Sequence, residues 1–138
     1  MAMQLGITMT NLQTVLRESD VISIHVPGSK DNIGLIGSEE FKAMKNGAVA
    51  INTSRGIVVD SAALLNAIKN GHIAGAGIDV YTQEPPNPDE PVLQDSRILC
   101  APHTASETIE TFSKNSELIV RQIIDAFEGR TPGNWVNP

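Results

Sequence analysis

Three ionisable residues in separate polar segments of the chain could carry out proton transfer on a substrate that bears a carboxylate. Arg55 lies in the segment INTSRG, and an arginine in a rigid turn can hold a carboxylate through two parallel hydrogen bonds. Histidine titrates near neutral pH, and a neighbouring carboxylate stabilises the charged imidazole and fixes its ring. We therefore predict that Arg55 binds an anion and that Glu84 and His103 form a general acid–base pair.

Each of these residues also has a purely structural interpretation. An arginine before a glycine in a turn is usually a solvated loop residue. A histidine in the position of His103, after Pro102, is as often a hydrogen-bonding loop residue as a catalyst. Glu84 lies in an acidic, proline-rich loop and can simply carry solubilising charge. Asp79 can likewise cap the turn that follows an apolar strand. We interpret His72 as a structural or surface residue and Cys100 as a small buried residue.

The elements that must position these residues alternate between short apolar strands and amphipathic helices. Runs of β-branched and small apolar residues predict strands at residues 21–26, 48–52, 74–80 and 98–101, the first of them buried on both faces. Helical spacing predicts helices at residues 11–19 and 107–127. Two further helices are predicted from their capping residues, one between a cap at Ser38 and a stop at Gly47, the other between a cap at Asp60 or Ser61 and a stop at Gly71. Residues 83–91 contain four prolines and are predicted to form a loop.

This alternation predicts βαβ crossovers and therefore an α/β fold with an open parallel sheet. Ligands of such sheets bind at the carboxyl ends of the strands, because the crossover loops converge at that edge. The carboxyl ends of the predicted strands and the loops that follow them carry the polar candidates, in the order His25, Thr53, Ser54, Arg55, Asp79, Glu84 and His103. We therefore expect a site at the carboxyl edge. For His25 alone, packing at the edge is preferred over contact with a ligand.

The composition excludes several classes of protein. The 138 residues carry a net charge of -6, which opposes binding to nucleic acid or to an anionic membrane surface. No apolar stretch reaches the roughly 20 residues that a membrane span requires. The single Cys100 cannot form an intramolecular disulfide, so we expect a cytoplasmic protein. The three histidines lie far apart, and no HxxxH, HExxH or CxxC spacing occurs, so we predict no metal site.

Three segments together resemble the second half of the D-isomer-specific 2-hydroxyacid dehydrogenases, a family that includes phosphoglycerate dehydrogenases, hydroxypyruvate and glyoxylate reductases and D-lactate dehydrogenases. The segments are SDVISIHVP, LIGSEEFKAMKNGAVAINTSRGIVVDSAALLNAIKNGHIAGAGIDVYTQEP and APHTASET. The resemblance runs from about Leu12 to the C-terminus, and the ordered set of motifs is far more specific than any one of them.

The resemblance implies a role for each candidate residue. Arg55 would bind the substrate carboxylate, and His103 would donate a proton to the keto oxygen as a hydride arrives from the nicotinamide, with Glu84 holding that histidine. The resemblance implies NAD as the cofactor, with NADP left open, and a small 2-keto or D-2-hydroxy acid as the substrate. It implies that the cofactor lies against Thr53, Ser54, Arg55, Asp79 and His103 on its nicotinamide side and against His25, Val26 and Pro27 on its adenine side.

The chain departs from the family pattern in one large respect. It lacks the GxGxxG phosphate-binding loop, the acidic residue about 20 positions later, and the family's N-terminal substrate segment. We expect residues 1–104 to be the second half of a Rossmann-like, doubly wound nucleotide-binding domain and residues 105–138 to be a long C-terminal helix and tail. Such a chain would be a truncated piece or a naturally split product.

We expect the isolated chain to be inactive and to form a homodimer, because removal of the first half would expose an apolar strand edge. The alternative function is a non-enzymatic dinucleotide-sensing or dimerisation module. The presence of Arg55, Glu84 and His103 together favours the oxidoreductase, since a binding module needs no proton relay.

Overall fold

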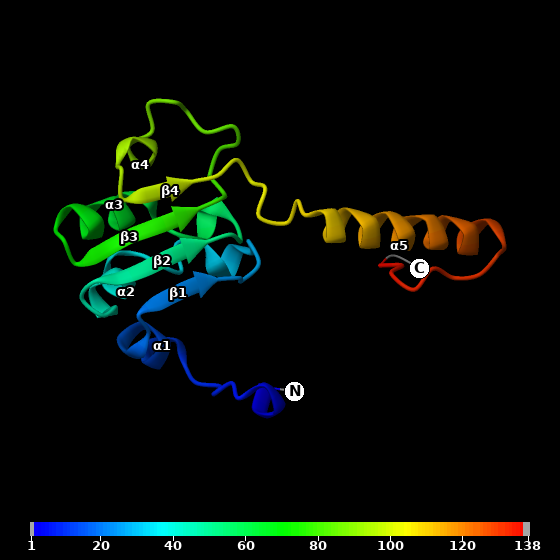
Figure 1. Ribbon diagram of the computed structural model, residues 1–138, viewed down its shortest axis with the longest axis horizontal. Helices are drawn as coiled ribbons and strands as arrows, with labels where there is room; N and C mark the ends of the chain where they lie inside the picture. The colour runs from blue at the N-terminus through cyan, green and yellow to red at the C-terminus, as the bar shows by residue number, and fades with distance from the viewer. Residues whose placement is uncertain (1, 137–138) are drawn as a thin grey trace. The chain divides into compact units, whose positions relative to one another are not determined.

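A parallel four-stranded sheet forms the centre of the first of two compact units (Figure 1). The computed structural model describes residues 2–136, and the boundary between the units lies between His103 and Thr104. In chain order the first unit contains η1 (Ala2–Leu5), α1 (Leu12–Glu18), β1 (Val21–Ile24), η2 (Lys30–Asn32), α2 (Ser38–Ala43), β2 (Ala48–Asn52), η3 (Gly56–Val58), α3 (Ser61–Lys69), β3 (Ile73–Ile78), α4 (Pro91–Gln94) and β4 (Ile98–Cys100).

The strands lie in the sheet in the order β1-β2-β3-β4, and each neighbouring pair is parallel. One row of the register joins Ile22, Ala50, Ala76 and Ile98 across all four strands. Every connection is therefore a crossover that returns the chain to the same end of the sheet. This arrangement confirms the predicted α/β fold with a parallel sheet, and it gathers the loops that follow the strands at one edge.

Local sequence signals explain where the helices begin. The Asn11 side chain accepts a hydrogen bond from the Thr14 N–H at 2.9 Å, and Asp60 Oδ1 accepts from the N–H groups of Ala62 and Ala63 at 2.9 and 3.0 Å. Of the two predicted caps of α3, Asp60 and Ser61, the structure shows Asp60. The prediction of a cap at Ser38 was wrong: α2 begins there, Gly37 is the cap residue, and its N–H donates to the Glu40 side chain at 3.1 Å.

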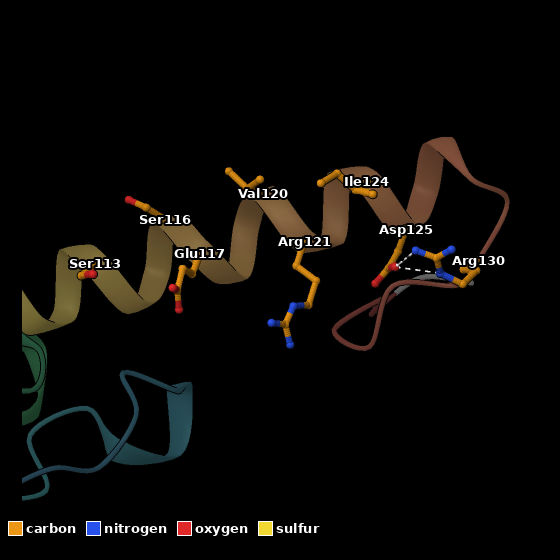
Figure 2. Close-up of a pocket in the computed structure, with 8 residues that line it drawn as sticks. All are labelled: Ser113, Ser116, Glu117, Val120, Arg121, Ile124, Asp125 and Arg130. Atoms are coloured by element: carbon orange, nitrogen blue, oxygen red, sulfur yellow. Dashed lines mark hydrogen bonds and ion pairs between the residues drawn. The ribbon is translucent and has the colours of Figure 1, made fainter.

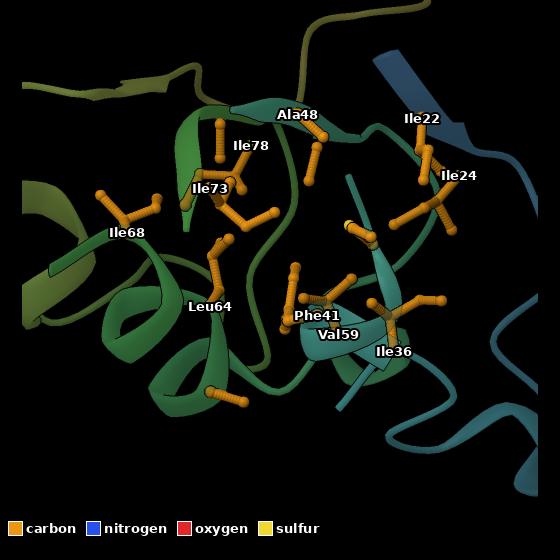
Figure 3. Close-up of a cluster of buried hydrophobic side chains, with 14 of the residues drawn as sticks. Ile22, Ile24, Ile36, Phe41, Ala48, Val59, Leu64, Ile68, Ile73 and Ile78 are labelled. Atoms are coloured by element: carbon orange, nitrogen blue, oxygen red, sulfur yellow. The ribbon is translucent and has the colours of Figure 1, made fainter. Parts of the chain in front are cut away.

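The core lies between one face of the sheet and the helices α2 and α3. Figure 3 shows Leu64 of α3 directed toward Ile73 of β3, and Phe41 of α2 is also fully buried. Burial of each such side chain contributes about 1.5–3 kcal/mol to folding. The core fixes the strands and therefore the starting points of the loops at the carboxyl edge.

The structure corrects the prediction that the first strand is buried on both faces. The strand ends at Ile24, and its residues alternate, with Ile22 and Ile24 buried and Val21 and Ser23 exposed. The physical reason is that the core covers only one face of β1 in the described part of the chain. The apolar run VISIHV is therefore compatible with one-sided burial, because an exposed β-branched residue also favours a strand.

The second unit contains the predicted long helix, α5 (Ile109–Phe127). The Thr108 side chain caps it by accepting a hydrogen bond from the Thr111 N–H at 3.1 Å, and Gly129 follows it with a φ of 76°. Its apolar stripe is exposed, including Ile109, Phe112 and Phe127. Among residues 2–136, no helix is both long enough and apolar enough to span a bilayer.

Candidate active site

The loops that follow β1, β2 and β3 approach one another closely at the carboxyl edge. A Cβ atom on Gly28 would lie 2.8 Å from Cγ of Arg55, and a Cβ atom on Gly56 would lie 2.0 Å from the carbonyl carbon of Tyr81. A side chain at Gly56 would therefore displace the neighbouring loop, and a side chain at Gly28 would displace the side chain of Arg55. The sequence brings segments far apart in the chain together here because it places glycine at each contact.

Asn52, at the end of β2, shapes the turn that carries Arg55. Its side chain is 3% exposed, accepts hydrogen bonds from the Ser54 N–H at 3.1 Å and the Ser54 hydroxyl at 2.8 Å, and donates to the Arg55 carbonyl at 3.0 Å. Its own carbonyl accepts from the Asp79 N–H at 3.0 Å. The buried side-chain amide thus fixes the turn, and the Asn52 backbone joins the start of the turn to the end of β3.

Arg55 presents an exposed cation at this edge. Its Nη1 donates to the Ser54 carbonyl at 2.6 Å, and this is the guanidinium's one hydrogen bond to the described residues. A guanidinium has five N–H donors, so most of them are available to an external anion. A planar, permanently charged group in a fixed turn suits the two-pronged binding of a carboxylate.

Glu84 and His103 form a hydrogen-bonded pair across 19 residues of sequence. The His103 Nδ1 lies 2.8 Å from Glu84 Oε2, and Glu84 Oε1 accepts a hydrogen bond from the Tyr81 N–H at 3.0 Å. The Tyr81 N–H, then the hydrogen bond to His103, and also the Arg55 charge lower the pKa of Glu84. Glu84 is therefore an ionised acceptor at neutral pH and can hold the imidazole with a proton on Nδ1.

The backbone of His103 has an unusual conformation. Its φ is 59°, in the left-handed region, and it is the one residue other than glycine with a positive φ among those described. Such a conformation costs of order 1–3 kcal/mol and persists where the surroundings enforce it. The side chain is 43% exposed, so Nε2 can reach a ligand while Nδ1 is bound to Glu84.

Tyr81 links the loop after β3 to the loop after β4. Its hydroxyl donates to the Ala101 carbonyl at 3.0 Å, two residues before His103. Burial, and then the neighbouring Cys100, raise the pKa of Tyr81 from 10.0 to about 12. Neither Tyr81 nor Asn52 was among the predicted site residues. The available signals were a polar residue that ends an apolar strand and the only tyrosine in the chain.

The structure places the other candidates at the same edge in different roles. Asp79 is 5% exposed at the end of β3, and the buried Ser54 hydroxyl is engaged by Asn52. His25 is exposed, and its Nε2 lies 2.8 Å from the Ser23 hydroxyl. The remaining candidates are the half-buried Thr53 and Val26 and the exposed Pro27, whose carbonyl accepts from Asn32 at 2.8 Å.

His72 has the structural role predicted for it, whereas Cys100 is less buried than predicted. His72 Nε2 is 3.1 Å from the Met44 carbonyl, at the amino end of β3 and away from the carboxyl edge. Cys100 is half-buried and its Sγ contacts the Val92 carbonyl at 3.7 Å. Within the described ranges, no three His, Cys, Asp or Glu side chains gather as they would around a metal ion.

A separate concavity of about 580 Å³ lies along α5 in the second unit (Figure 2). It is lined by Ser113, Ser116, Glu117, Val120, Arg121, Ile124, Asp125 and Arg130. Asp125 is bound to the Arg130 Nε at 2.8 Å, so this acid and base neutralise each other. The concavity holds no histidine and no acid–base pair of the Glu84–His103 type, and it is not the candidate site.

Comparison with known proteins places these features in a family context. The model of the D-isomer specific 2-hydroxyacid dehydrogenase NAD binding domain matches residues 1–105. A glyoxylate reductase of Korarchaeum cryptofilum is 44% identical over 134 residues, which cover 97% of this chain and 40% of the relative. The chain thus spans about 40% of the length of this curated relative.

Solved structures agree with the sequence matches. A D-lactate dehydrogenase from Lactobacillus jensenii, solved with NAD+, is 30% identical with a TM-score of 0.86, covering 96% of this chain and 44% of the other. A D-isomer specific 2-hydroxyacid dehydrogenase from Xanthobacter autotrophicus, solved with NADPH and MES, is 34% identical with a TM-score of 0.77, covering 92% and 52%.

Proposed function

Because the chain belongs to the D-isomer specific 2-hydroxyacid dehydrogenase family, we propose that it is the part of a nicotinamide-dependent oxidoreductase that binds a small 2-keto acid and protonates its oxygen. The single observation that carries this proposal is the pair formed by Glu84 Oε2 and His103 Nδ1 at 2.8 Å. The pair lies at the carboxyl edge of the sheet, where Arg55 supplies an exposed cation.

Arg55 would hold the substrate by its carboxylate. The turn of residues 53–56 is fixed by Asn52, so the guanidinium starts from a rigid base. Binding one end of a 2-keto acid in this way orients the neighbouring keto group, which is one carbon away. Orientation of this kind is a large part of catalysis in reactions between two bound groups.

His103 would move the proton. With Nδ1 bound to Glu84, the protonated imidazole can donate the Nε2 proton to the keto oxygen, and in the reverse direction neutral Nε2 can accept it. Glu84 remains ionised, because the Tyr81 N–H and His103 lower its pKa, and its charge stabilises the imidazolium. A bound nicotinamide cofactor supplies or accepts the hydride.

The residues around the pair fit the nicotinamide end of such a cofactor. Asp79 is buried, and its backbone N–H pairs with the carbonyl of Asn52, the residue that precedes the turn of residues 53–56. A carboxamide can bind to polar groups of this kind. Thr53, Ser54 and Asp79 would hold that end, and residues 25–27 would lie toward the adenine. No GxGxxG loop occurs in the sequence, so other residues of the enzyme would hold the pyrophosphate.

We propose NAD as the cofactor, and the NADPH-bound relative makes NADP the second candidate. Glyoxylate is the first substrate to test, because the relative with 44% identity is a glyoxylate reductase.

The test is a chimera in which this chain replaces the matching segment of that glyoxylate reductase. Oxidation of NADH or NADPH is measured by absorbance with glyoxylate as substrate. The proposal predicts turnover that depends on both the substrate and the cofactor. A folded chimera that binds the cofactor and shows no turnover would contradict the proposal and would favour the binding-module alternative.

A further inference from the structure

Tyr81 contacts all three loops that carry the proposed catalytic and binding residues. Its N–H donates to Glu84 Oε1 at 3.0 Å, and its hydroxyl donates to the Ala101 carbonyl at 3.0 Å. Its carbonyl carbon lies against Gly56, the residue after Arg55. Within the described residues, Tyr81 is thus the point at which the three loops meet.

The hydrogen bond from Tyr81 holds Ala101, the residue at which the chain leaves the sheet before His103. The Ala101 N–H donates to the Ile78 carbonyl at 2.9 Å, which continues the pairing of β4 with β3. The Ala101 carbonyl is then held by Tyr81, and the chain leaves the sheet toward the left-handed conformation of His103. Fixing both backbone groups of Ala101 defines where the following residues start.

We propose that Tyr81 is a positioning residue that keeps Glu84 and His103 within hydrogen-bonding distance. Its N–H orients the Glu84 carboxylate, and its hydroxyl fixes the loop that carries His103. Because both contacts come from one residue, they hold the carboxylate and the histidine loop at a fixed separation. The catalytic meaning of this role rests on the proposed function, whereas the geometric role can be tested without activity.

A purely structural role makes a different prediction. If Tyr81 only fills space and ties two loops for stability, its removal would lower the free energy of unfolding and leave the imidazole of His103 as it is. If Tyr81 positions the pair, loss of the hydroxyl would weaken the bond between His103 Nδ1 and Glu84 and so change which imidazole nitrogen carries the proton.

The tautomer of His103 is therefore the measurement. The chain labelled with ¹⁵N-histidine is examined by long-range ¹H–¹⁵N NMR at about pH 9, where imidazole side chains are neutral. The variants are Tyr81→Phe, which removes only the hydroxyl, and Tyr81→Leu, which also removes the ring. The matched control is His72→Phe, because His72 is also half-buried and also binds one backbone carbonyl, at 3.1 Å.

The unchanged chain and His72→Phe are expected to show His103 mainly as the Nδ1–H tautomer. Tyr81→Phe is expected to lower the ratio of the Nδ1–H to the Nε2–H form by about threefold or more, the order of effect that a side-chain hydrogen bond has on an equilibrium. Tyr81→Leu is expected to lower it at least as much.

Two results would overturn the proposal, and they are distinguishable. If His103 stays in the Nδ1–H form in both Tyr81 variants while the unchanged chain shows that form, the role of Tyr81 alone is refuted and the acid–base pair stands. If the unchanged chain already shows mainly the Nε2–H form, the Glu84–His103 pair itself is refuted, and the proposed function loses the observation on which it depends.

Discussion

A Cβ atom on Gly56 would lie 2.0 Å from the carbonyl carbon of Tyr81 and 2.3 Å from the backbone nitrogen of Thr82. Both neighbours are backbone atoms, which cannot move aside as the end of a flexible side chain can. The turn that carries Arg55 and the loop that carries Glu84 are therefore in direct backbone contact. The relative placement of Arg55 and the Glu84–His103 pair therefore depends on the absence of a side chain at residue 56.

Gly56→Ala is expected to destabilise the chain by about 1–3 kcal/mol, because an added methyl group in a filled space forces the backbone to shift. The free energy of unfolding is measured by urea denaturation. The control is Gly77→Ala in β3, where a Cβ atom would lie 3.8 Å from the Ile51 side chain, an ordinary contact. That variant should change stability by less than about 1 kcal/mol. Equal effects of the two variants would refute the close approach.

Asn52→Ala is expected to loosen the turn of residues 53–56. The substitution removes the partner of the Ser54 N–H and of the Arg55 carbonyl, and leaving buried polar groups unsatisfied costs about 1–3 kcal/mol. The control is Asn66→Ala on the exposed face of α3, which should stay within about 0.5 kcal/mol. Chemical denaturation measures both. The account of the turn fails if Asn52→Ala is as stable as the control.

Glu84 should contribute to stability only while it is ionised. The Tyr81 N–H, and then His103, lower its pKa below the ordinary 4.5. A carboxyl with a lower pKa in the folded chain gives stability that is present above the unfolded pKa and is lost as pH falls through the folded value. The free energy of unfolding of the unchanged chain should therefore fall more steeply below about pH 4.5 than that of Glu84→Gln.

The control for this pH series is Glu117→Gln, which removes an exposed carboxyl of α5 that has no hydrogen bond to another described side chain. Denaturation curves collected between neutral pH and about pH 3 should show the same slope for this variant as for the unchanged chain. Parallel pH profiles for Glu84→Gln and the unchanged chain would mean that the hydrogen bonds of Glu84 do not stabilise its charge.

The isolated chain is expected to bind NAD weakly or not at all. The sequence lacks a GxGxxG loop, and loss of the anion site that such a loop forms plausibly removes several kcal/mol, with each 1.4 kcal/mol equal to about a tenfold change in affinity. Isothermal titration calorimetry measures the affinity, with an intact NAD-binding relative as the positive control. Sub-micromolar binding by this chain would show that the described loops hold the whole dinucleotide.

Sequence patterns predicted the parallel sheet, the long helix and the edge at which the ionisable residues gather. They succeeded because short apolar runs, caps such as Asp60 and the proline-rich loop are local signals. They failed where the outcome depends on tertiary contacts. One-sided burial of β1 depends on where the core lies, and the roles of Asn52 and Tyr81 depend on hydrogen bonds to other segments. The left-handed backbone of His103 could not be predicted from the sequence, because only a few per cent of residues other than glycine adopt it, even though histidine is enriched among them.

The most direct test of the acid–base account uses the chimera of this chain and the glyoxylate reductase. In that chimera His103→Ala and Arg55→Ala are compared with the control His72→Phe. His103→Ala should lower kcat by roughly 10² to 10⁴, the usual contribution of a general acid–base. Arg55→Ala should raise KM for glyoxylate strongly as well as lowering kcat, because it acts on the substrate carboxylate. Wild-type kcat and KM in both variants would contradict the assignment of His103 as proton donor and Arg55 as carboxylate clamp.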